Sequence, residues 1–208
     1  MIPRMEPARV AKSPSAEDVD HRVFLHGVSW EQYEALDALR GESSVPRLTY
    51  LDGELELMSP SRHHETDKSL LGRLVVAYAE EMDIDLNAYG SWTLKKQVEK
   101  VAAEPDECYV VGDHDVERPD FAIEVVWTSG GISKLEVYRR LEVPEVWFYQ
   151  HDRLRFYRLG RNGYREIPRS RFLPGFEPDL VIPFLRERNQ SRAVRAFREA
   201  LRARLTNR

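Results

Sequence analysis

The sequence predicts an α/β fold in which a central mixed sheet is flanked by helices and extended by β-hairpins. Segments with helical and extended patterns alternate along most of the chain, as they do in layered α/β domains. One extended segment, residues 121–127, is an almost continuous apolar run, which is typical of a strand covered on both faces. A chain of 208 residues with 42% apolar residues can form one domain with a sizeable core.

The two ends of the chain differ in composition from the middle. Residues 1–20 mix proline, serine and charged residues without periodicity, which predicts a disordered leader. Residues 186–208 contain eight Arg and two Glu, a net charge of +6, so the remainder contributes −10 to the total of −4. We therefore expect a leader over 1–20, a domain over 21–185 and a basic C-terminal helix over 186–208.

The first half of the domain predicts a helix, a hairpin and a longer helix. Ser29 is a good N-cap for a helix that begins at Trp30, because apolar residues recur at helical spacing after it. Asp52 and Gly53 form a two-residue turn signal between two strands. An apolar stripe over residues 62–82 then predicts a long amphipathic helix.

The second half of the domain predicts most of the central sheet. The expected elements are extended segments over 86–98, 104–111 and 120–127, a helix over 132–141, a strand over 145–149, a hairpin over 153–167 and a helix over 190–205. The aromatic residues of this half are expected in the core rather than as a platform for stacking bases: Trp127, Tyr138, Trp147, Phe148 and Tyr149.

Composition also restricts the setting in which the protein works. The lone cysteine, Cys108, excludes a disulfide framework and a cysteine-rich zinc site, and we expect it in the core. The sequence contains no apolar stretch of about 18 residues and no apolar segment typical of a secretion signal near its start. We therefore expect a cytoplasmic protein that does not bind membranes. Because the body is acidic, it would meet a polyanion through a local groove, a metal ion or the basic tail.

Two carboxylates on neighbouring strands are the most informative residues. Glu124 lies inside the apolar run, where an ionised side chain is costly unless it is compensated, and Asp106 begins the preceding extended segment. A hairpin folded about Asp115 would place these two acids directly opposite each other, with Cβ atoms about 4.5–5.5 Å apart. Opposed acids repel unless a cation lies between them, and Mg²⁺ is commonly held by one or two carboxylates, water and phosphate.

Other interpretations of the acids are open at this point. Asp120 also follows a proline, but on an extended strand it would lie about 13 Å from Glu124, so we expect it to cap the strand start instead. Glu124 could also form a buried ion pair with Lys134.

The ordered set of motifs resembles a known family. The matching segments are EPDECYVVG at 104–112, PDFAIEV at 119–125, a lysine and a tyrosine at 134 and 138, and VPEVW at 143–147. Over residues 30–185 they resemble the Uma-type restriction endonucleases of the PD-(D/E)XK nuclease superfamily. The resemblance implies a restriction-endonuclease-like core in which Asp106 and Glu124 bind the metal ion. It also implies that Lys134 replaces the usual lysine, whose position here is Val126, and that Glu65 is a further candidate ligand.

These implications lead to a functional hypothesis. We expect hydrolysis of DNA phosphodiesters with Mg²⁺, or Mn²⁺ as a substitute, in which the metal ion activates water and Lys134 orients it or stabilises the reacting phosphate. The expected partners are DNA and a second copy of the chain, and we expect phosphate contacts from Arg192, Arg195 and Arg198. The alternatives are a catalytically silent DNA-binding or interaction module with the same fold, and a metal-dependent phosphoesterase acting on small nucleotides.

Overall fold

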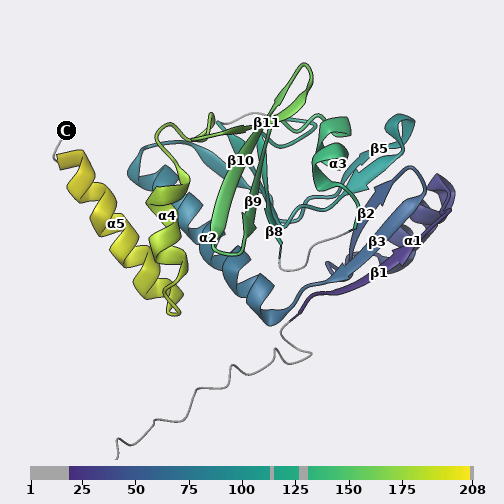
Figure 1. The fold of residues 1–208 in the computed structure, drawn as a ribbon, viewed down its shortest axis with the longest axis horizontal. Coiled ribbons are helices and arrows are strands. Elements are labelled where there is room, and N and C mark those ends of the chain that lie inside the picture. The colour runs from purple at the N-terminus through teal and green to yellow at the C-terminus, as the bar shows by residue number, and fades with distance from the viewer. Residues whose placement is uncertain (1–18, 113–114, 127–130, 207–208) are drawn as a thin grey trace, which may run out of the picture.

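The computed structural model describes residues 19–112, 115–126 and 131–206, whose strands form two sheets (Figure 1). The five-stranded sheet contains, in spatial order, β1 (His21–Leu25), β3 (Glu54–Ser59), β2 (Arg47–Leu51), β6 (Val101–Ala103) and β5 (Leu94–Lys96). The six-stranded sheet contains β11 (Gly163–Ile167), β10 (Arg153–Gly160), β9 (Glu145–Gln150), β8 (Phe121–Val125), β7 (Glu107–Val111) and β4 (Leu86–Ala88). In the latter, β8 and β9 are parallel and the other neighbours are antiparallel, so this sheet is mixed.

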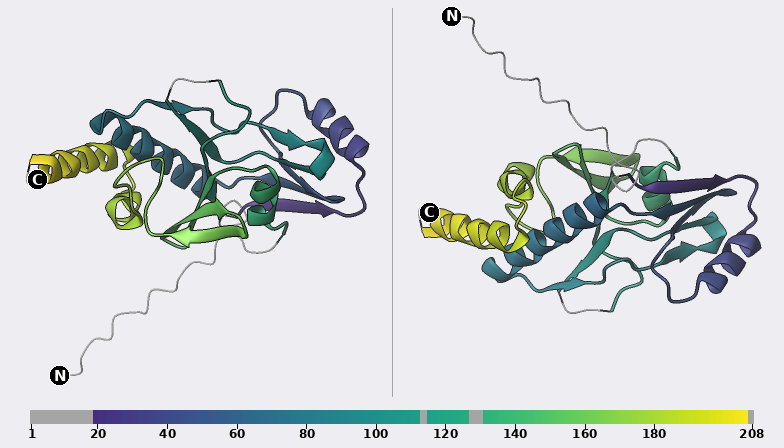
Figure 2. Two further views of the ribbon diagram at one scale, coloured as in Figure 1. Left: turned by 90° about the horizontal axis from the view of Figure 1, so that it is seen from above. Right: turned by 90° about the horizontal axis from the view of Figure 1, so that it is seen from below.

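The helices cover the sheets on different faces (Figures 1 and 2). They are α1 (Trp30–Arg40), α2 (Arg62–Glu81), α3 (Lys134–Arg140), α4 (Pro178–Leu185) and α5 (Gln190–Thr206), with a short 3₁₀ turn at Gln97–Glu99. The helices α2, α4 and α5 pack on one face of the six-stranded sheet, and α3 packs on the other face, next to β6. The remaining helix, α1, packs on the five-stranded sheet. The predicted α/β fold with a mixed sheet and flanking helices is therefore confirmed.

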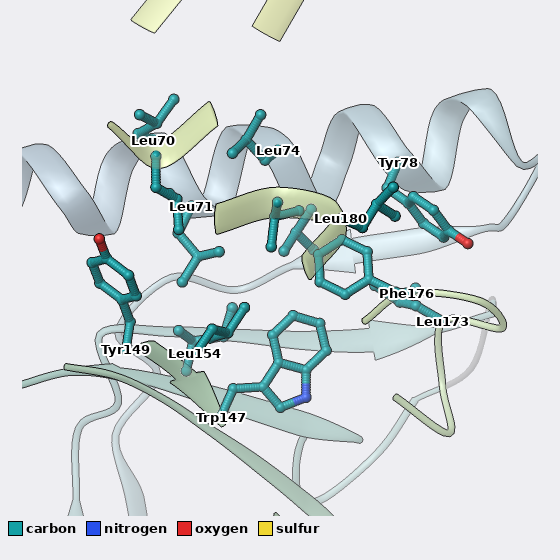
Figure 3. Close-up of a cluster of buried hydrophobic side chains, with 14 of the residues drawn as sticks. Leu70, Leu71, Leu74, Tyr78, Trp147, Tyr149, Leu154, Leu173, Phe176 and Leu180 are labelled. Carbon is teal, nitrogen blue, oxygen red and sulfur yellow. The ribbon is translucent and has the colours of Figure 1, made fainter. Parts of the chain in front are cut away.

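The largest core lies between α2 and the six-stranded sheet (Figure 3). The apolar stripe predicted for residues 62–82 faces this core, and Trp147 stacks on Phe176 there with ring centroids 5.0 Å apart. Phe197 and Leu201 of α5 are buried in the same cluster. The arginine-rich helix is therefore part of the domain core rather than an appendage beyond residue 185.

Local sequence signals account for several of these elements. Ser29 caps α1 in a capping box with Gln32, as its position predicted. The turn between β2 and β3 consists of Asp52 and Gly53, both with positive φ, which is the backbone that a type I′ hairpin requires. All residues of β8 are buried, as the continuous apolar run predicted, whereas Trp127 lies outside the described residues.

Three segments differ from the expectation. Residues 86–98 do not form one strand, because β4 joins the six-stranded sheet and β5 joins the other. Residues 104–106 are not part of a strand but cross from β6 in one sheet to β7 in the other, so Asp106 lies at the junction of the sheets. Asp20, expected in the leader, is buried and directly precedes β1, an edge strand that the sequence did not predict.

Candidate functional site

The β7–β8 hairpin has the register that the sequence predicted. Glu107 lies opposite Ile123 and Cys108 opposite Ala122. The next position of this register pairs Asp106 with Glu124. The backbone N–H of Val125, the residue after Glu124, donates a hydrogen bond of 2.6 Å to Oδ2 of Asp106. The two acids are thus held together by the backbone at the junction of the sheets.

Lys134 and Tyr138, both from α3, contact the carboxylate of Glu124. Nζ of Lys134 lies 3.2 Å from Oε1 of Glu124 and donates a second hydrogen bond, of 3.0 Å, to Thr49 on β2. The Tyr138 hydroxyl donates to the same oxygen, Oε1. Burial, together with the neighbouring Glu124 charge, raises the pKa of Tyr138 well above its ordinary value, so this hydroxyl stays protonated. The ion pair between Glu124 and Lys134, which the sequence offered as an alternative interpretation, is therefore present.

Ser133 explains how Lys134 reaches this position. Its side chain accepts a hydrogen bond from the backbone of Glu136 and caps α3, whose first residue is Lys134. The side chain of Lys134 is only 17% exposed, so the ammonium is directed inward to Glu124 rather than solvated on the helix surface. The structure therefore brings all three predicted residues to one place, although Lys134 does not follow Glu124 on the same strand.

Asp106 also has two cationic or polar partners that the sequence did not indicate. Nε2 of His64 lies 2.9 Å from Oδ1 of Asp106, and Arg47 forms an ion pair with the same oxygen. Arg47 also donates a hydrogen bond of 2.8 Å to Glu65. The side chains of Asp106, His64 and Arg47 are at most 5% exposed, so this cluster is shielded from water.

Glu65 therefore approaches Asp106 only through Arg47. Its second carboxylate oxygen pairs with Lys68 at 3.1 Å, and the side chain is 43% exposed. The further candidate ligand thus lies beside the site with both oxygens already in contact with cations.

A second carboxylate, Asp20, fixes the imidazole of His64. Oδ2 of Asp20 lies 3.0 Å from Nδ1 of His64, and Oδ1 accepts a hydrogen bond of 2.8 Å from the backbone of Ser61, the N-cap residue of α2. Burial raises the pKa of Asp20, but the hydrogen bonds from His64 and Ser61 outweigh it and leave this pKa below its ordinary value. Each nitrogen of the ring thus faces a carboxylate, an arrangement known to orient histidines in functional sites.

Glu56 is a further acid at this junction that the sequence interpretation missed. Glu56 belongs to β3, where it is 2% exposed, lies opposite Thr49 of β2, and forms an ion pair of 3.6 Å with Arg22. The alternation of side chains along a strand could have indicated this position, because Leu55 and Leu57 lie on the opposite face of β3 from Glu56. Glu54, two residues earlier, is exposed and contacts His26.

The donor set of the junction fits a hard cation better than zinc. Lys134 and Tyr138 both donate to the same oxygen of Glu124, Oε1. Asp106 and Glu124 offer carboxylate oxygens, which are the ligands that Mg²⁺ takes in proteins. Across 19–112, 115–126 and 131–206, no group of three or more His, Cys, Asp or Glu residues is arranged to hold a metal ion. Asp106 and Glu124 would therefore be a two-carboxylate site, which Mg²⁺ accepts because it retains water and phosphate ligands.

Asp120 has the structural role expected of it. Its Oδ2 accepts a hydrogen bond of 2.8 Å from the backbone of Val111, and its own N–H donates to Tyr109. Asp120 therefore closes the β7–β8 hairpin at the end opposite to Asp106.

The arginines of α5 divide into structural and exposed ones. Arg198 forms ion pairs with Glu80 and Glu81 of α2, and Arg202 pairs with Glu81 at 2.7 Å. Arg192 is 3.6 Å from Glu187, whereas Arg195 is exposed and has no ion pair within the described chain. Arg198 thus attaches α5 to α2, while phosphate contact by Arg192 and Arg195 stays a prediction.

Among the helices of the described residues, none combines the length and apolar character that crossing a bilayer requires.

Comparison with known proteins adds a family to this geometry. The model of the Uma2 family, described as "Putative restriction endonuclease", matches residues 30–193. No curated protein matches the chain. The chain is also similar to a solved structure described as a "putative nuclease belonging to DUF820" from Anabaena variabilis. That similarity has 14% sequence identity and a TM-score of 0.47, and it covers 67% of this chain and 90% of that chain.

Proposed function

Because this chain belongs to the Uma2 family of restriction-endonuclease-like proteins, we propose that it is a Mg²⁺-dependent endonuclease that hydrolyses phosphodiester bonds of DNA. Family membership agrees with the α/β fold and restriction-endonuclease-like core predicted from the sequence. One observation carries the proposal beyond the family. Two buried acids and a lysine converge at the sheet junction, where Asp106 bonds to the backbone beside Glu124 and Lys134 pairs with Glu124.

Each residue of this group has a role that its surroundings support. Asp106 and Glu124 would hold Mg²⁺, which when bound neutralises developing charge on the phosphate and lowers the pKa of the attacking water. Lys134, directed by Glu124 and Thr49, orients that water or stabilises the reacting phosphate. Asp20 and His64 position Asp106 by fixing the imidazole against it.

One observation favours a second candidate, a DNA-binding module without cleavage. Arg47 already forms an ion pair with Asp106 and His64 contacts the same oxygen, and a buried acid with such partners is stable without a metal ion. In that case the acids would be structural, and Mg²⁺ would have no effect on the protein.

Cleavage of plasmid DNA with Mg²⁺ or Mn²⁺ tests the proposal on three charge-removing variants. Asp106→Asn and Glu124→Gln should abolish nicking and weaken Mg²⁺ binding measured by calorimetry, because an amide carries no net charge to hold a hard dication. Lys134→Met should slow nicking but leave Mg²⁺ binding intact, because the lysine acts on water and phosphate. Asp120→Asn is the matched control, since it removes an acid from the same hairpin but keeps the acceptor for Val111.

Several results would contradict the proposal. Equal nicking by the three variants would assign cleavage to a different site or to a contaminant, and loss only in Asp120→Asn would assign it to the other Pro-Asp pair. A wild-type protein that binds DNA but neither binds Mg²⁺ nor cleaves would be the DNA-binding module. Sedimentation of the protein with and without DNA tests the further expectation that it acts as a homodimer.

A further inference from the structure

A row of residues connects the acids to the outer strands of the six-stranded sheet. Glu124 on β8 lies beside Phe148 on β9, and Phe148 lies opposite Arg155 on β10. Residues in such registered positions share one face of the sheet. Arg155 is therefore two strand spacings from Glu124, roughly 10 Å, on the face that α3 covers.

A cavity of about 260 Å³ lies along this row, beside α3. Its lining includes Lys134, Phe148, Arg153, Arg155 and Tyr157. Lys134 thus belongs both to the candidate active site and to this cavity, which joins the two. The volume is below the ~300–1,000 Å³ of pockets that enclose a whole ligand, so it suits part of a longer molecule.

The charge of the lining has one sign. Three of the lining residues are cationic, and no acid is among the described residues that line the cavity. Glu166 lies opposite Tyr157 on β11 and is not in the lining. Lys134 is paired with Glu124, but Arg153 and Arg155 form no ion pair with any described residue, so the cavity favours an anion at these two arginines.

The two arginines contrast with those that hold the fold together. Arg47 and Arg198 are committed to carboxylates, whereas Arg153 and Arg155 form no ion pair with any residue that the structure describes. Arg155 and Tyr157 are two residues apart on β10 and line the same cavity, and interaction with the Tyr157 side chain raises the pKa of Arg155. Tyr157 in turn packs edge-on against Phe148, with ring centroids 5.7 Å apart.

We propose that this cavity binds the nucleotide next to the scissile phosphate, with Arg153 and Arg155 on the backbone phosphate and the exposed side of Tyr157 against the sugar or base. The inference rests on the proposed nuclease function and specifies how its substrate strand is held. A strand whose phosphate lies at Lys134 can extend directly over the cavity, because Lys134 belongs to both places. Cations with a neighbouring ring are the combination that grips a single nucleic-acid strand.

The test compares two double variants that remove the same charge. Arg153→Gln/Arg155→Gln alters the cavity, and Arg161→Gln/Arg169→Gln, two exposed arginines outside its lining, is the matched control. DNA binding is measured by fluorescence anisotropy of a labelled oligonucleotide in EDTA, across a series of salt concentrations. The cavity variant should lose tenfold or more in affinity, and its plot of log K against log salt should become less steep by about 2. In the control variant, the affinity and the slope should each change by less than half of these amounts.

A third variant tests the aromatic contact separately from charge. Tyr157→Leu should weaken binding roughly fivefold or more without changing the salt slope, because stacking does not release counterions. In nicking assays with Mg²⁺, all cavity variants should raise KM and leave kcat close to that of the wild type. Circular dichroism of each variant confirms that its fold is retained.

The outcomes separate this inference from the proposal on which it rests. If wild type cleaves DNA but the cavity variant binds and cleaves like the control pair, the cavity assignment is wrong and the nuclease assignment stands. If wild type neither binds nor cleaves DNA, both are wrong. If the cavity variant lowers kcat at unchanged KM, the arginines act on the reaction itself and the substrate-holding role is wrong.

Discussion

Asp20→Ala should destabilise the folded protein far more than its position near the chain terminus suggests. The carboxylate of Asp20 is fully buried and accepts hydrogen bonds from the Ser61 backbone at 2.8 Å and from His64 at 3.0 Å. Alanine leaves both of these groups without a partner in a space that is shielded from water. A hydrogen bond to a charged group contributes about 1.5–3 kcal/mol, so the expected loss in free energy of unfolding is about 3–5 kcal/mol.

Urea denaturation followed by circular dichroism measures this loss. The midpoint should fall while the m-value stays constant, because the surface exposed on unfolding is unchanged. Asp20→Asn should lose about half as much, since the amide oxygen still accepts from Ser61. Asp115→Ala, an exposed aspartate without a described contact, is the control and should change stability by less than about 0.5 kcal/mol.

A chain that begins at Val19 gives the complementary measurement. It should be as stable as the full chain if Asp20 alone fixes this end, whereas removal of residue 20 as well should reproduce the Asp20→Ala loss. A loss below about 1 kcal/mol for Asp20→Ala would refute the reasoning, because it would mean that water or another group satisfies His64 and Ser61.

Three further predictions follow from other contacts. The ion pairs with α5 lower the pKa of Glu81 from 4.5 to about 2, so their contribution to stability is complete above about pH 4.5 and is lost as the pH falls towards 2. Glu81→Gln should therefore flatten the plot of unfolding free energy against pH between pH 2 and 5, and an unchanged plot would contradict this assignment. Gly131→Ala should destabilise the protein by more than about 1 kcal/mol and impair nicking, because the φ of Gly131 is +100° and a Cβ there would lie 2.6 Å from Glu56. Gly90→Ala is the control: Gly90 also has a positive φ but open space around it, so this variant should lose less stability and nick DNA like the wild type. Phe197→Ala should cost about 3–5 kcal/mol in thermal or urea unfolding, because the ring is fully buried in the main core, and a much smaller loss would return α5 to the role of an appendage.

The sequence predicted the elements whose causes are local. Ser29, the Asp52-Gly53 turn and the apolar stripe of α2 act within a few residues, and each formed the expected structure. The register of Asp106 and Glu124 could also be predicted, because a hairpin brings neighbouring strands together with one adjustable parameter, the position of its centre.

The surroundings of the acids depend on contacts that have no local signal. Asp20, Arg47 and His64 come from three separate segments and meet Asp106 only because two sheets join there. In sequence, an arginine on a strand and an aspartate near a terminus indicate exposed positions. The split of residues 86–98 between the sheets has the same origin, since each half pairs with a strand that the pattern does not specify.

The crossing at residues 104–106 makes the candidate site a joint between the two sheets. Thr49 and Arg47 belong to one sheet and Glu124 to the other, with Asp106 on the connection and Lys134 reaching across. Any ligand that binds there must therefore hold the sheets against each other, and by mass action it adds about 2.7 kcal/mol to the folded state at a concentration 100 times its Kd. Occupancy of the site should thus protect amides in both sheets from hydrogen exchange, including those of β1 and β11, far from any contact with the ligand.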